Sequence, residues 1–493
     1  MRKNRLRALA IVVGLCLILA LPGIVSANGN EYVIYDPSTH TYTVLPTDVD
    51  DTENLQLAFD TAAASGIEST VQLIEGTYFI SHDIFVADFV GTFKGAGMDQ
   101  TLVRSRGDAP FGTVDGWAAL FDFGYLYAGA DANSPVDVKF SDMSLRAYGE
   151  TEPYWNHGAL TTQFGGLINV FTGYWVNEGK HSYVDVSFEN MRFTGGEHPQ
   201  YRSNSLWGID IEYFRDSTLT VSGCIFEDHD WESIFVGGYL DSTVTIGGSP
   251  QSKNVFVKGF DNYNAYNGAD FQAVAIMDVA NTNIEVSYCE TYDNSGVWFR
   301  QAGRFYPVPN VSPSTLLIHH NTFRQPSAYA TDWAGIELWD YWNAWYGEST
   351  IKPVIQQNLI ISETHIAPWG PIFGCSIDDA VIAYNIFRGE GLAAIYLTGA
   401  ADWGISDVTS TRCLLIGNNL AGFDSYLADI YFGIGTSECM VIGGHDVFDE
   451  NTYWFGITTN VFVGVNNMQG NSPGQAIAAA MEHKRELMDL LCY

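Results

Sequence analysis

Leu316-Leu-Ile-His-His-Asn-Thr-Phe323 is the first of several segments that repeat one short pattern in the second half of the chain. Later copies are Val354-Ile-Gln-Gln-Asn-Leu-Ile360, Val381-Ile-Ala-Tyr-Asn-Ile-Phe387, Leu414-Leu-Ile-Gly-Asn-Asn-Leu420 and, without the asparagine, Met440-Val-Ile-Gly-Gly-His-Asp-Val-Phe448. The aligned asparagines are Asn321, Asn358, Asn385 and Asn418, at steps of 37, 27 and 33 residues. A period in this range, built on short β-type segments, is typical of a solenoid.

The repeat also decides the domain organisation. A chain of 493 residues would ordinarily suggest about three domains. A solenoid instead grows by adding coils, so we expect one solenoid over residues 28–465. A C-terminal helical segment should follow at 466–493, because Ser472 and Pro473 form a typical helix start.

The first 27 residues have the pattern of a secretory signal peptide. A basic start is followed by the apolar run 8–21 and by the small-residue cleavage site Val25-Ser26-Ala27. The apolar run is shorter than the roughly 20 residues that a membrane span needs. We therefore expect a secreted or cell-surface protein without stable membrane insertion, and an uncleaved N-terminal anchor is the alternative.

The charge of the chain limits its partners. A formal net charge of −34 disfavours binding to nucleic acids and to anionic membranes. It is compatible with calcium, with cationic partners or with a saline environment. Most of the carboxylates are expected to be solvated surface groups.

The cysteines are not arranged as a zinc site, because no CxxC pair occurs. Cys413 and Cys439 precede equivalent segments, so a solenoid should stack them about 4.8 Å apart. Cys289 should share a register with Cys224. The Cys413–Cys439 stack leaves open either a disulfide or two free thiols.

A helix is expected near the start of the solenoid. Asp51 or Thr52 can cap it, Gly66 can end it, and its apolar stripe is Leu55, Ala58, Phe59 and Ala62. Such a helix would cover the open end of the stacked sheets.

These N-terminal residues also carry a family resemblance. Asp51-Thr-Glu-Asn-Leu-Gln-Leu-Ala-Phe-Asp60, followed by Val71-Gln-Leu-Ile-Glu-Gly-Thr-Tyr78, resembles the opening of the pectate-lyase-like right-handed parallel β-helix superfamily. The resemblance covers residues 48–465 and implies an all-β, right-handed parallel β-helix with an N-terminal capping helix. It does not imply one activity: of the polygalacturonase motifs, the chain shows only an Asp378-Asp379 pair, in a turn.

A second strand recurs after each asparagine turn, for example Val297-Trp-Phe-Arg300 and Ile336-Glu-Leu-Trp339. Strand alternation should point one column outward. That column is Phe235, Trp298, Glu337, Phe373, Tyr396 and Tyr431. A neighbouring column holds Arg300, Trp339, Cys375 and Thr398, and an earlier coil adds Asp210 and Glu212.

Aromatic rings at one-strand steps, with acids and an arginine among them, suit a polysaccharide, because sugar rings stack on aromatic faces. The candidate substrate-binding residues are Phe235, Trp298, Trp339, Phe373, Tyr396, Tyr431, Asp210 and Glu212. The alternative is an aromatic sheet face buried under long loops.

Catalysis by this face would depend on its charged residues. A glycoside hydrolase needs two carboxylates roughly 5 to 10 Å apart, for which Glu232 or Asp278 with Glu337 are candidates. A polysaccharide lyase needs a base and a cation beside the uronate carboxylate, and Arg300 is a candidate for either role. Calcium is the candidate cofactor, with Asp230, Glu232 and Asp278 as its ligands.

The sequence therefore predicts an exported β-helix that binds or acts on extracellular polysaccharide, with a lyase favoured over a hydrolase. A non-catalytic surface, adhesion or structural β-helix protein is the alternative. The sequence does not determine the oligomeric state.

Overall fold

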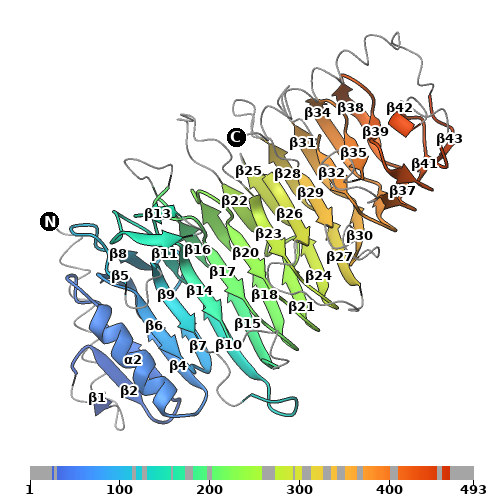
Figure 1. Cartoon of the computed structure of the whole chain (residues 1–493). Coiled ribbons are helices and arrows are strands. Elements are labelled where there is room, and N and C mark those ends of the chain that lie inside the picture. The colour runs from blue at the N-terminus through green and yellow to red at the C-terminus, as the bar shows by residue number, and fades with distance from the viewer. Residues whose placement is uncertain are drawn as a thin grey trace.

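Three long sheets wind around one axis in the computed structural model (Figure 1). The structure describes residues 25–26, 30–113, 118–124, 130–156, 159–172, 181–196, 203–257, 272–292, 295–301, 313–325, 335–340, 350–362, 370–399, 409–451 and 458–466. The chain visits the sheets in a fixed order, as in β4 (Ser69–Leu73), β5 (Gly76–Ile80) and β6 (Ile84–Ala87), and then begins the next coil with β7 (Gly91–Lys94). This is a right-handed parallel β-helix, as predicted.

The sheets are named A, B and C by the order in which a coil meets them. Sheet A has 16 strands, and β4 and β7 are followed in it by β10 (Val136–Ser141), β15 (Val184–Glu189), β18 (Thr218–Ser222), β21 (Thr243–Ile246), β24 (Asn283–Ser287), β27 (Ser314–His319), β30 (Ile351–Gln356), β33 (Val381–Ala383), β37 (Leu414–Ile416), β41 (Met440–Ile442) and β43 (Val461–Val463). The N-terminal strands β1 (Val25–Ser26), β2 (Val33–Asp36) and β3 (Thr41–Val44) complete it.

Sheet B has 11 strands: β5, β8 (Thr101–Ser105), β11 (Ser144–Arg146), β16 (Arg192–Thr194), β19 (Ile225–Glu227), β22 (Asn254–Val257), β25 (Cys289–Tyr292), β28 (Thr322–Gln325), β31 (Leu359–Ser362), β34 (Ile386–Gly391) and β38 (Asn419–Ser425). Sheet C has 12: β6, β9 (Ala119–Gly124), β14 (Gly166–Phe171), β17 (Ile209–Glu212), β20 (Ile234–Gly237), β23 (Gln272–Met277), β26 (Ser295–Gln301), β29 (Ile336–Asp340), β32 (Ile372–Cys375), β35 (Ile395–Thr398), β39 (Ile430–Phe432) and β42 (Val447–Asp449). Two small pairs are β12 (Tyr154–Asn156) with β13 (Ala159–Thr161) and β36 (Ser410–Thr411) with β40 (Thr436–Ser437).

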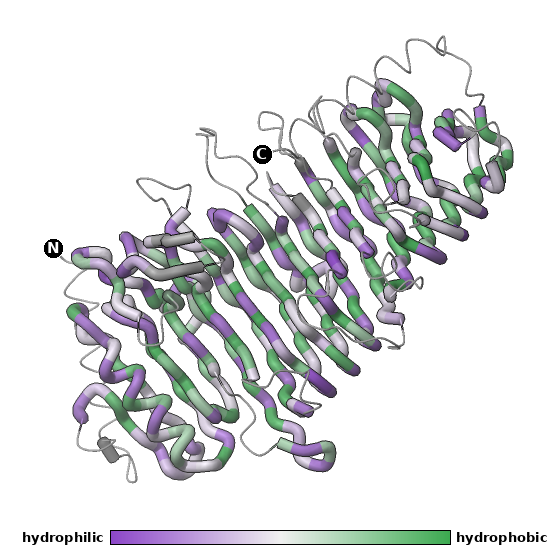
Figure 2. Tube along the Cα trace, viewed as in Figure 1, coloured by the Kyte–Doolittle hydropathy of each residue, from purple (hydrophilic) through white to green (hydrophobic). Residues whose placement is uncertain are grey.

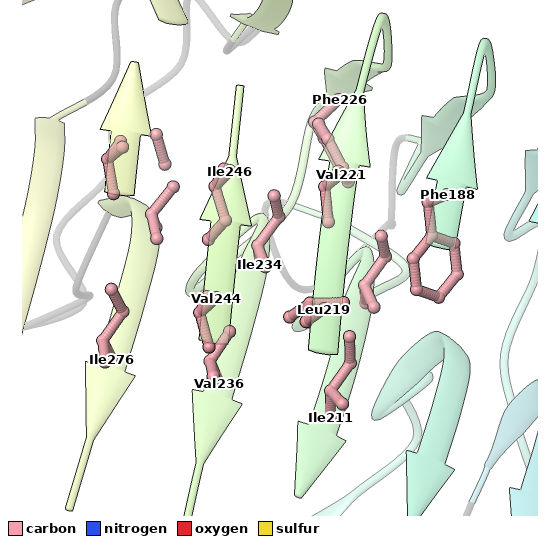
Figure 3. Packing of buried hydrophobic residues seen from close by; sticks show 14 of the residues in the cluster. Phe188, Ile211, Leu219, Val221, Phe226, Ile234, Val236, Val244, Ile246 and Ile276 are labelled. Carbon is pink, nitrogen blue, oxygen red and sulfur yellow. The ribbon is translucent and has the colours of Figure 1, made fainter. Parts of the chain in front are cut away.

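The core lies inside the coil and is built from stacked apolar side chains. Figure 3 shows Ile234 and Val236 of β20 pointing toward Val244 and Ile246 of β21 across the interior. The alternation of apolar and polar residues along the strands is visible in Figure 2. Because each strand repeats its inward residues at the same register, like side chains stack, and the rings of Phe193 and Phe226 lie 4.9 Å apart.

The asparagines of the repeat form a buried ladder at the corner between sheets A and B. The side chain of Asn321 donates to Oδ1 of Asn358, at 3.0 Å, and the same contact joins Asn358 to Asn385 and Asn385 to Asn418. Each side-chain nitrogen also donates to a strand carbonyl, that of Ile318 in the case of Asn358. These bonds satisfy backbone groups that the sharp corner would otherwise leave buried and unpaired.

The same column continues toward the N-terminus with other residues. Cys289 donates its backbone N–H to Oδ1 of Asn321, and Cys224 donates its own to Oδ1 of Asn254. Cys224 and Cys289 therefore share a register, as predicted, with Asn254 between them. At the corner between sheets C and A, Cys413 and Cys439 occupy neighbouring coils as free thiols, which is one of the two expected alternatives.

One helix, α2 (Thr52–Ala64), covers the N-terminal end of the β-helix (Figure 1). Its buried apolar residues are Leu55, Ala58, Phe59 and Ala62, the predicted stripe. Gly66 follows the helix with φ +65°, a conformation that glycine adopts without strain. None of the helices within the described residues has the length and hydrophobicity needed to cross a membrane. The expected C-terminal helix and the expected signal peptide, apart from β1, lie outside the described ranges.

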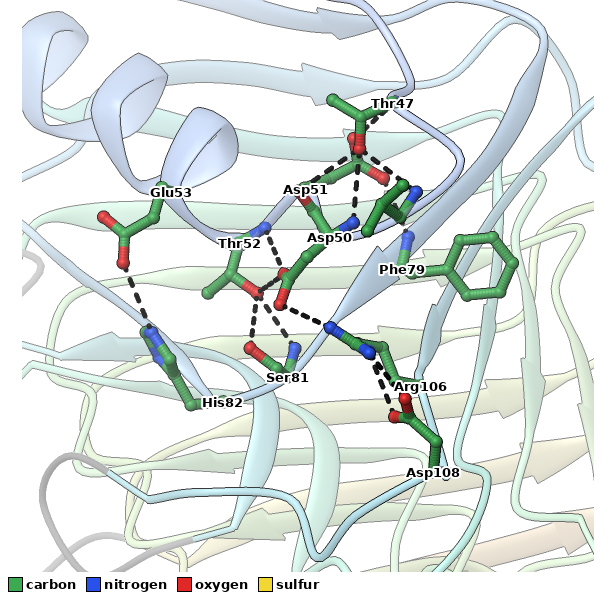
Figure 4. Close-up of polar contacts among 11 residues, drawn as sticks. Thr47, Asp50, Asp51, Thr52, Glu53, Phe79, Ser81, His82, Arg106 and Asp108 are labelled. Atoms are coloured by element: carbon green, nitrogen blue, oxygen red, sulfur yellow. Dashed lines mark hydrogen bonds and ion pairs between the residues drawn. The ribbon is translucent and has the colours of Figure 1, made fainter.

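The start of α2 is fixed by two neighbouring carboxylates (Figure 4). Asp50 accepts hydrogen bonds from the backbone and the hydroxyl of Thr52, and Arg106 donates to its other oxygen at 3.3 Å. The fully buried Asp51 accepts from the backbone N–H groups of Thr47 and Phe79. Asp51 is therefore the N-cap residue, one of the two predicted, but its side chain makes no capping hydrogen bond, and Asp50 accepts from the helix N-terminus instead.

Asp50 gives a prediction about pH. Burial alone would raise its pKa, but the hydrogen bonds that it accepts outweigh burial and hold the pKa of Asp50 below its ordinary value. The ionised form therefore stabilises the fold above the unfolded-state pKa of about 3.9, and this contribution is lost as the pH falls through the folded-state value. Near pH 7 the urea midpoint of the wild type should be higher than that of Asp50→Asn. This difference in midpoint should shrink as the pH falls toward about 3. A difference that does not depend on pH would contradict this role.

Candidate functional site

The predicted outward column lies on sheet C with the predicted register. Strand pairing aligns Trp298 with Glu337, Glu337 with Phe373, Phe373 with Tyr396 and Tyr396 with Tyr431. Between Phe235 and Trp298 the structure inserts one more strand, β23, whose outward residue is Ala275. Phe448 of β42 adds one step at the C-terminal end.

The column also extends toward the N-terminus, where it becomes polar. Asp210 pairs with Phe235 on one side and with Asn169 on the other, and Asn169 pairs with Asp122. The sequence analysis named Asp210 but missed Asp122 and Asn169. The signal was present, because Phe121-Asp-Phe123 has the same apolar-acid-apolar form as Ile209-Asp-Ile211.

The column is buried, so the sheet face is covered rather than open. The exposed fraction is 6% for Trp298, 1% for Glu337, 0% for Phe373 and 4% for Tyr431. Neighbouring rings pack on each other, with centroids 4.5 Å apart for Tyr396 and Tyr431. Together with residues such as Trp207 and Trp339 they form a second hydrophobic cluster outside the main core. Of the two expected alternatives, an open groove or a covered face, the described residues form the covered face.

Four of the predicted residues come together on β26 and β29, and we call them the tryptophan quartet: Trp298, Arg300, Glu337 and Trp339. The guanidinium of Arg300 lies over the ring of Trp298, 5.7 Å from its centroid. Nε1 of Trp339 donates to Oε1 of Glu337. Arg300 is half-buried, whereas the other three side chains are buried. The quartet therefore offers one partly accessible cation beside a held carboxylate and two indole rings.

The other predicted carboxylates do not join Glu337. Glu232 precedes β20, three strands from Glu337 and three residues away along the strand direction. Asp278 follows β23, two strands across and three residues along. At about 4.8 Å per strand and about 3.3 Å per residue, the backbones of the two pairs are about 17 Å and about 14 Å apart. The roughly 5 to 10 Å spacing of hydrolase carboxylates would require both side chains of a pair to extend toward each other.

The predicted calcium ligands are also dispersed. Nε1 of Trp207 donates to Glu232 at 2.5 Å, and Nε2 of Gln163 donates to Asp230 at 2.9 Å. Asp278 lies at the opposite end of the strand direction, in a turn with φ +51°. Among the residues that the structure describes, no three His, Cys, Asp or Glu side chains are grouped so as to hold a metal ion.

The remaining candidate, Glu212, and the neighbouring acid Asp340 occupy the borders of the face. Glu212 is half-buried beside Gly237. Asp340 is buried and accepts hydrogen bonds from the backbone and hydroxyl of Thr350, which ties the end of β29 to the following segment.

Buried acids are concentrated at sheet C. The buried Asp and Glu residues in the described ranges are Asp51, Asp83, Asp122, Asp210, Asp230, Glu232, Asp278, Glu337, Asp340, Asp378, Asp449 and Glu450. All but Asp51 lie in a sheet C strand or within four residues of one. On the outer faces of sheets A and B, acids such as Asp185, Glu227 and Glu285 keep solvent exposure. Burying carboxylates costs free energy, so a one-sided cluster of them marks a candidate functional face.

Comparison with known proteins supports the fold. No protein-family model matches the sequence, and no curated protein matches it. The A-module of the Azotobacter vinelandii mannuronan C-5 epimerase AlgE6 superposes with a TM-score of 0.53 at 14% identity, covering 85% of this chain and 95% of that one. The AlgE4 A-module of the same organism gives 0.43 at 13% identity, covering 86% and 94%, and the Dettilon tailspike protein gives 0.43 at 12%, covering 85% and 68%.

Because the sequence identities are this low, the structural similarity establishes the fold of the protein and nothing about its activity. The protein is a parallel β-helix protein, and the covered, acid-bearing outer face of sheet C is its candidate functional site.

Proposed function

We propose that the protein is a secreted β-helix protein that engages an extracellular polysaccharide through the outer face of sheet C. The observation that carries this proposal is the concentration of buried carboxylates on that face, beside a column of aromatic side chains. The partly exposed rings at the border of this cluster, Tyr213, Trp231 and Phe448, would supply stacking surfaces for sugars, and fixed polar groups would supply partners for hydroxyls.

The tryptophan quartet favours proton abstraction over hydrolysis. The hydrolase candidates start from backbones about 14 to 17 Å apart, whereas Arg300 lies beside the carboxylate of Glu337 and combines a cation with partial exposure. Arg300 would bind the carboxylate of a uronate, which favours loss of the neighbouring C5 proton because the developing negative charge is neutralised. Glu337 would accept that proton, and the C4–O bond would break as the C4=C5 double bond forms, so that the glycosidic oxygen leaves and takes a proton from Glu337 or from water. A polysaccharide lyase is therefore the proposed enzyme class.

Two further observations support a polysaccharide substrate and an extracellular location. The solved structure with a TM-score of 0.53 is named for an enzyme that acts on mannuronan. The N-terminal pattern of residues 1–27 indicates export. Calcium stays a proposed cofactor, for which Asp230, Glu232 and Asp278 would each be a separate ligand, since the described residues do not bring the three together.

The test is a screen of polyuronates and neutral glycans, with and without calcium, for the absorbance of unsaturated products. We expect activity on a polyuronate, and Arg300→Ala should lower it by about 100-fold or more, because one charge-stabilising group is typically worth about 3 kcal/mol in the transition state. Lys352→Ala is the matched control, since Lys352 is an exposed cation on sheet A. Equal losses in the two variants would refute the role of Arg300.

A second candidate function is a non-catalytic surface or adhesion protein with the β-helix as a rigid spacer. The burial of the aromatic column favours it, because a covered face offers less surface to a polymer. Failure of every polyuronate and neutral glycan to be modified would decide for this candidate.

A further inference from the structure

The outer face of sheet B carries a row of arginines that the sequence analysis did not single out. Strand pairing places Arg104 beside Phe79 on one side and Arg146 on the other. Further along the same row, Arg324 pairs with Ile361, and Ile361 pairs with Arg388. We call Arg104, Arg146, Arg324 and Arg388 the arginine row.

The arginine row differs from most other cations in the described ranges by its lack of acidic partners, which Lys94 and Lys352 share. Six other Lys and Arg residues form ion pairs with Asp or Glu: Arg106, Lys139, Arg192, Arg215, Lys253 and Arg412. None of the four row arginines has a carboxylate within ion-pair distance in the described part of the chain. The chain holds 57 Asp and Glu against 23 Lys and Arg, so unpaired arginines on one row are unexpected from composition.

Aromatic side chains hold the first half of the row in place. The guanidinium of Arg104 lies 4.2 Å from the ring centroid of Tyr148 and 5.4 Å from that of Phe79. Its nitrogens donate to the backbone carbonyls of Ser105 and Arg106, at 3.1 and 3.2 Å. Burial, together with the charge of neighbouring Arg146, lowers the pKa of Arg104. The two arginines Arg104 and Arg146 thus lie on adjacent strands, whose backbones are about 4.8 Å apart.

In the second half an arginine again lies beside a tyrosine, but Ile361 separates Arg324 from Arg388. Arg324 lies 5.6 Å from the ring centroid of Tyr292, and its Nε has no hydrogen-bond partner among the described atoms. Tyr148 and Tyr292 are 44% and 40% exposed, so each arginine cluster presents an accessible aromatic ring. Between the halves lies Glu227, which accepts from Thr194 and faces Arg192 at 3.9 Å.

We propose that the arginine row is a binding site for an acidic polysaccharide, in which the guanidinium groups bind carboxylate or sulfate groups and Tyr148 and Tyr292 stack on sugar rings. Arginine pairs with planar carboxylates through two parallel hydrogen bonds, which makes it suited to this role. The site goes beyond the proposed function, because it lies on sheet B and needs no chemistry on sheet C.

The chemistry favours a glycan over a nucleic acid. Beyond about 8 Å, charges are largely screened at physiological salt, so a ligand close to the row meets its cations rather than the net charge of the chain. A nucleic acid presents a denser line of phosphates and would meet more repulsion from Glu227, which lies in the row between its two halves. A uronate chain carries its charges on rings that the exposed tyrosines can contact.

The test uses the full chain and measures binding to polygalacturonate, polymannuronate, neutral dextran and a single-stranded oligonucleotide by affinity electrophoresis at two salt concentrations. The double variant Arg104→Ala/Arg146→Ala should weaken binding to the acidic glycans by at least about tenfold. A loss of that size is expected because the variant removes hydrogen bonds between charged groups. The matched control Lys94→Ala/Lys352→Ala removes the same charge from sheet A and should stay within about twofold.

Retention of acidic-glycan binding by Arg104→Ala/Arg146→Ala would overturn the proposal, and so would an equal loss in the Lys94/Lys352 control. Tighter binding of the oligonucleotide than of either polyuronate would overturn the assignment to a glycan. The conservative pair Arg104→Lys/Arg146→Lys guards against misfolding, and it should recover part of the lost affinity. The two proposals can also fail separately. If binding depends on the arginine row, but no glycan is modified and Arg300→Ala has no effect, this inference stands and the proposed catalytic function is rejected.

Discussion

Replacing Phe59 by alanine should lower the free energy of unfolding by about 3–5 kcal/mol, the usual cost of removing a buried phenylalanine. The side chain is fully buried in α2, and its ring lies 5.0 to 5.4 Å from those of Phe89, Phe93 and Phe123. These rings belong to the first coils, so the cavity would open where the helix seals the end of the core. Urea unfolding at neutral pH measures the loss.

The position of the damage is as informative as its size. Because each coil of a solenoid contacts its neighbours alone, the loss should be largest at the N-terminal end, and hydrogen exchange should accelerate in β4–β9 before the later coils. Asp60→Ala is the matched control, since Asp60 is exposed on the same helix, and it should change stability by about 0.5 kcal/mol or less. Uniform acceleration along the whole chain would show that the protein unfolds as one unit.

Asn358→Leu should cost about 3–5 kcal/mol because of the hydrogen bonds that the ladder loses. Oδ1 of Asn358 accepts from the backbone and side chain of Asn321, and Nδ2 donates to the carbonyl of Ile318 and to Asn385. The variant would bury the N–H of Asn321 without its partner and would remove the side-chain hydrogen bond to the carbonyl of Ile318. Leucine has the same γ-branched shape but is larger, so the loss reports on polarity and added bulk rather than on a cavity.

The control for this prediction is Asn283→Leu. Asn283 is exposed on the outer face of sheet A and contacts Thr315. Its replacement should leave the urea midpoint nearly unchanged, within about 0.5 kcal/mol in free energy. If Asn358→Leu proves equally mild, the corner does not depend on the ladder.

The fold was predictable because the repeat encodes a register. The spacing of Asn321, Asn358, Asn385 and Asn418 aligned the strands, and the aligned second strands then placed Trp298 opposite Glu337, as the structure has them. Alternation along a strand determines which way a side chain faces. It does not determine whether anything covers that face, and for this reason the burial of Phe373 and Tyr431 did not follow from the sequence.

The candidate sites were likewise predictable only in part. The repeat placed Arg300 and Glu337 on one face, but Glu232 and Asp278 also lie three residues away along the strand direction, which strand alignment alone does not show. The arginine row was not predicted although a signal exists: Arg146, Arg324 and Arg388 each lie three positions after a corner residue, which is Met143, Asn321 or Asn385. Their common offset becomes meaningful once the strand register is known.

The ladder also restricts how the gene for such a chain can change in length. From Asn358 to Asn385 the backbone makes one closed turn of 27 residues and returns to the same corner with the same hydrogen bonds. Duplicating or losing that whole turn would join matching ends, and every later side chain would keep its face. Insertion of a single codon within a short strand would instead shift the later residues of that strand by one, so that inward side chains would point outward and outward ones inward. Growth by whole coils, with length variation left to the segments between sheets, is therefore the evolutionary path that this corner permits.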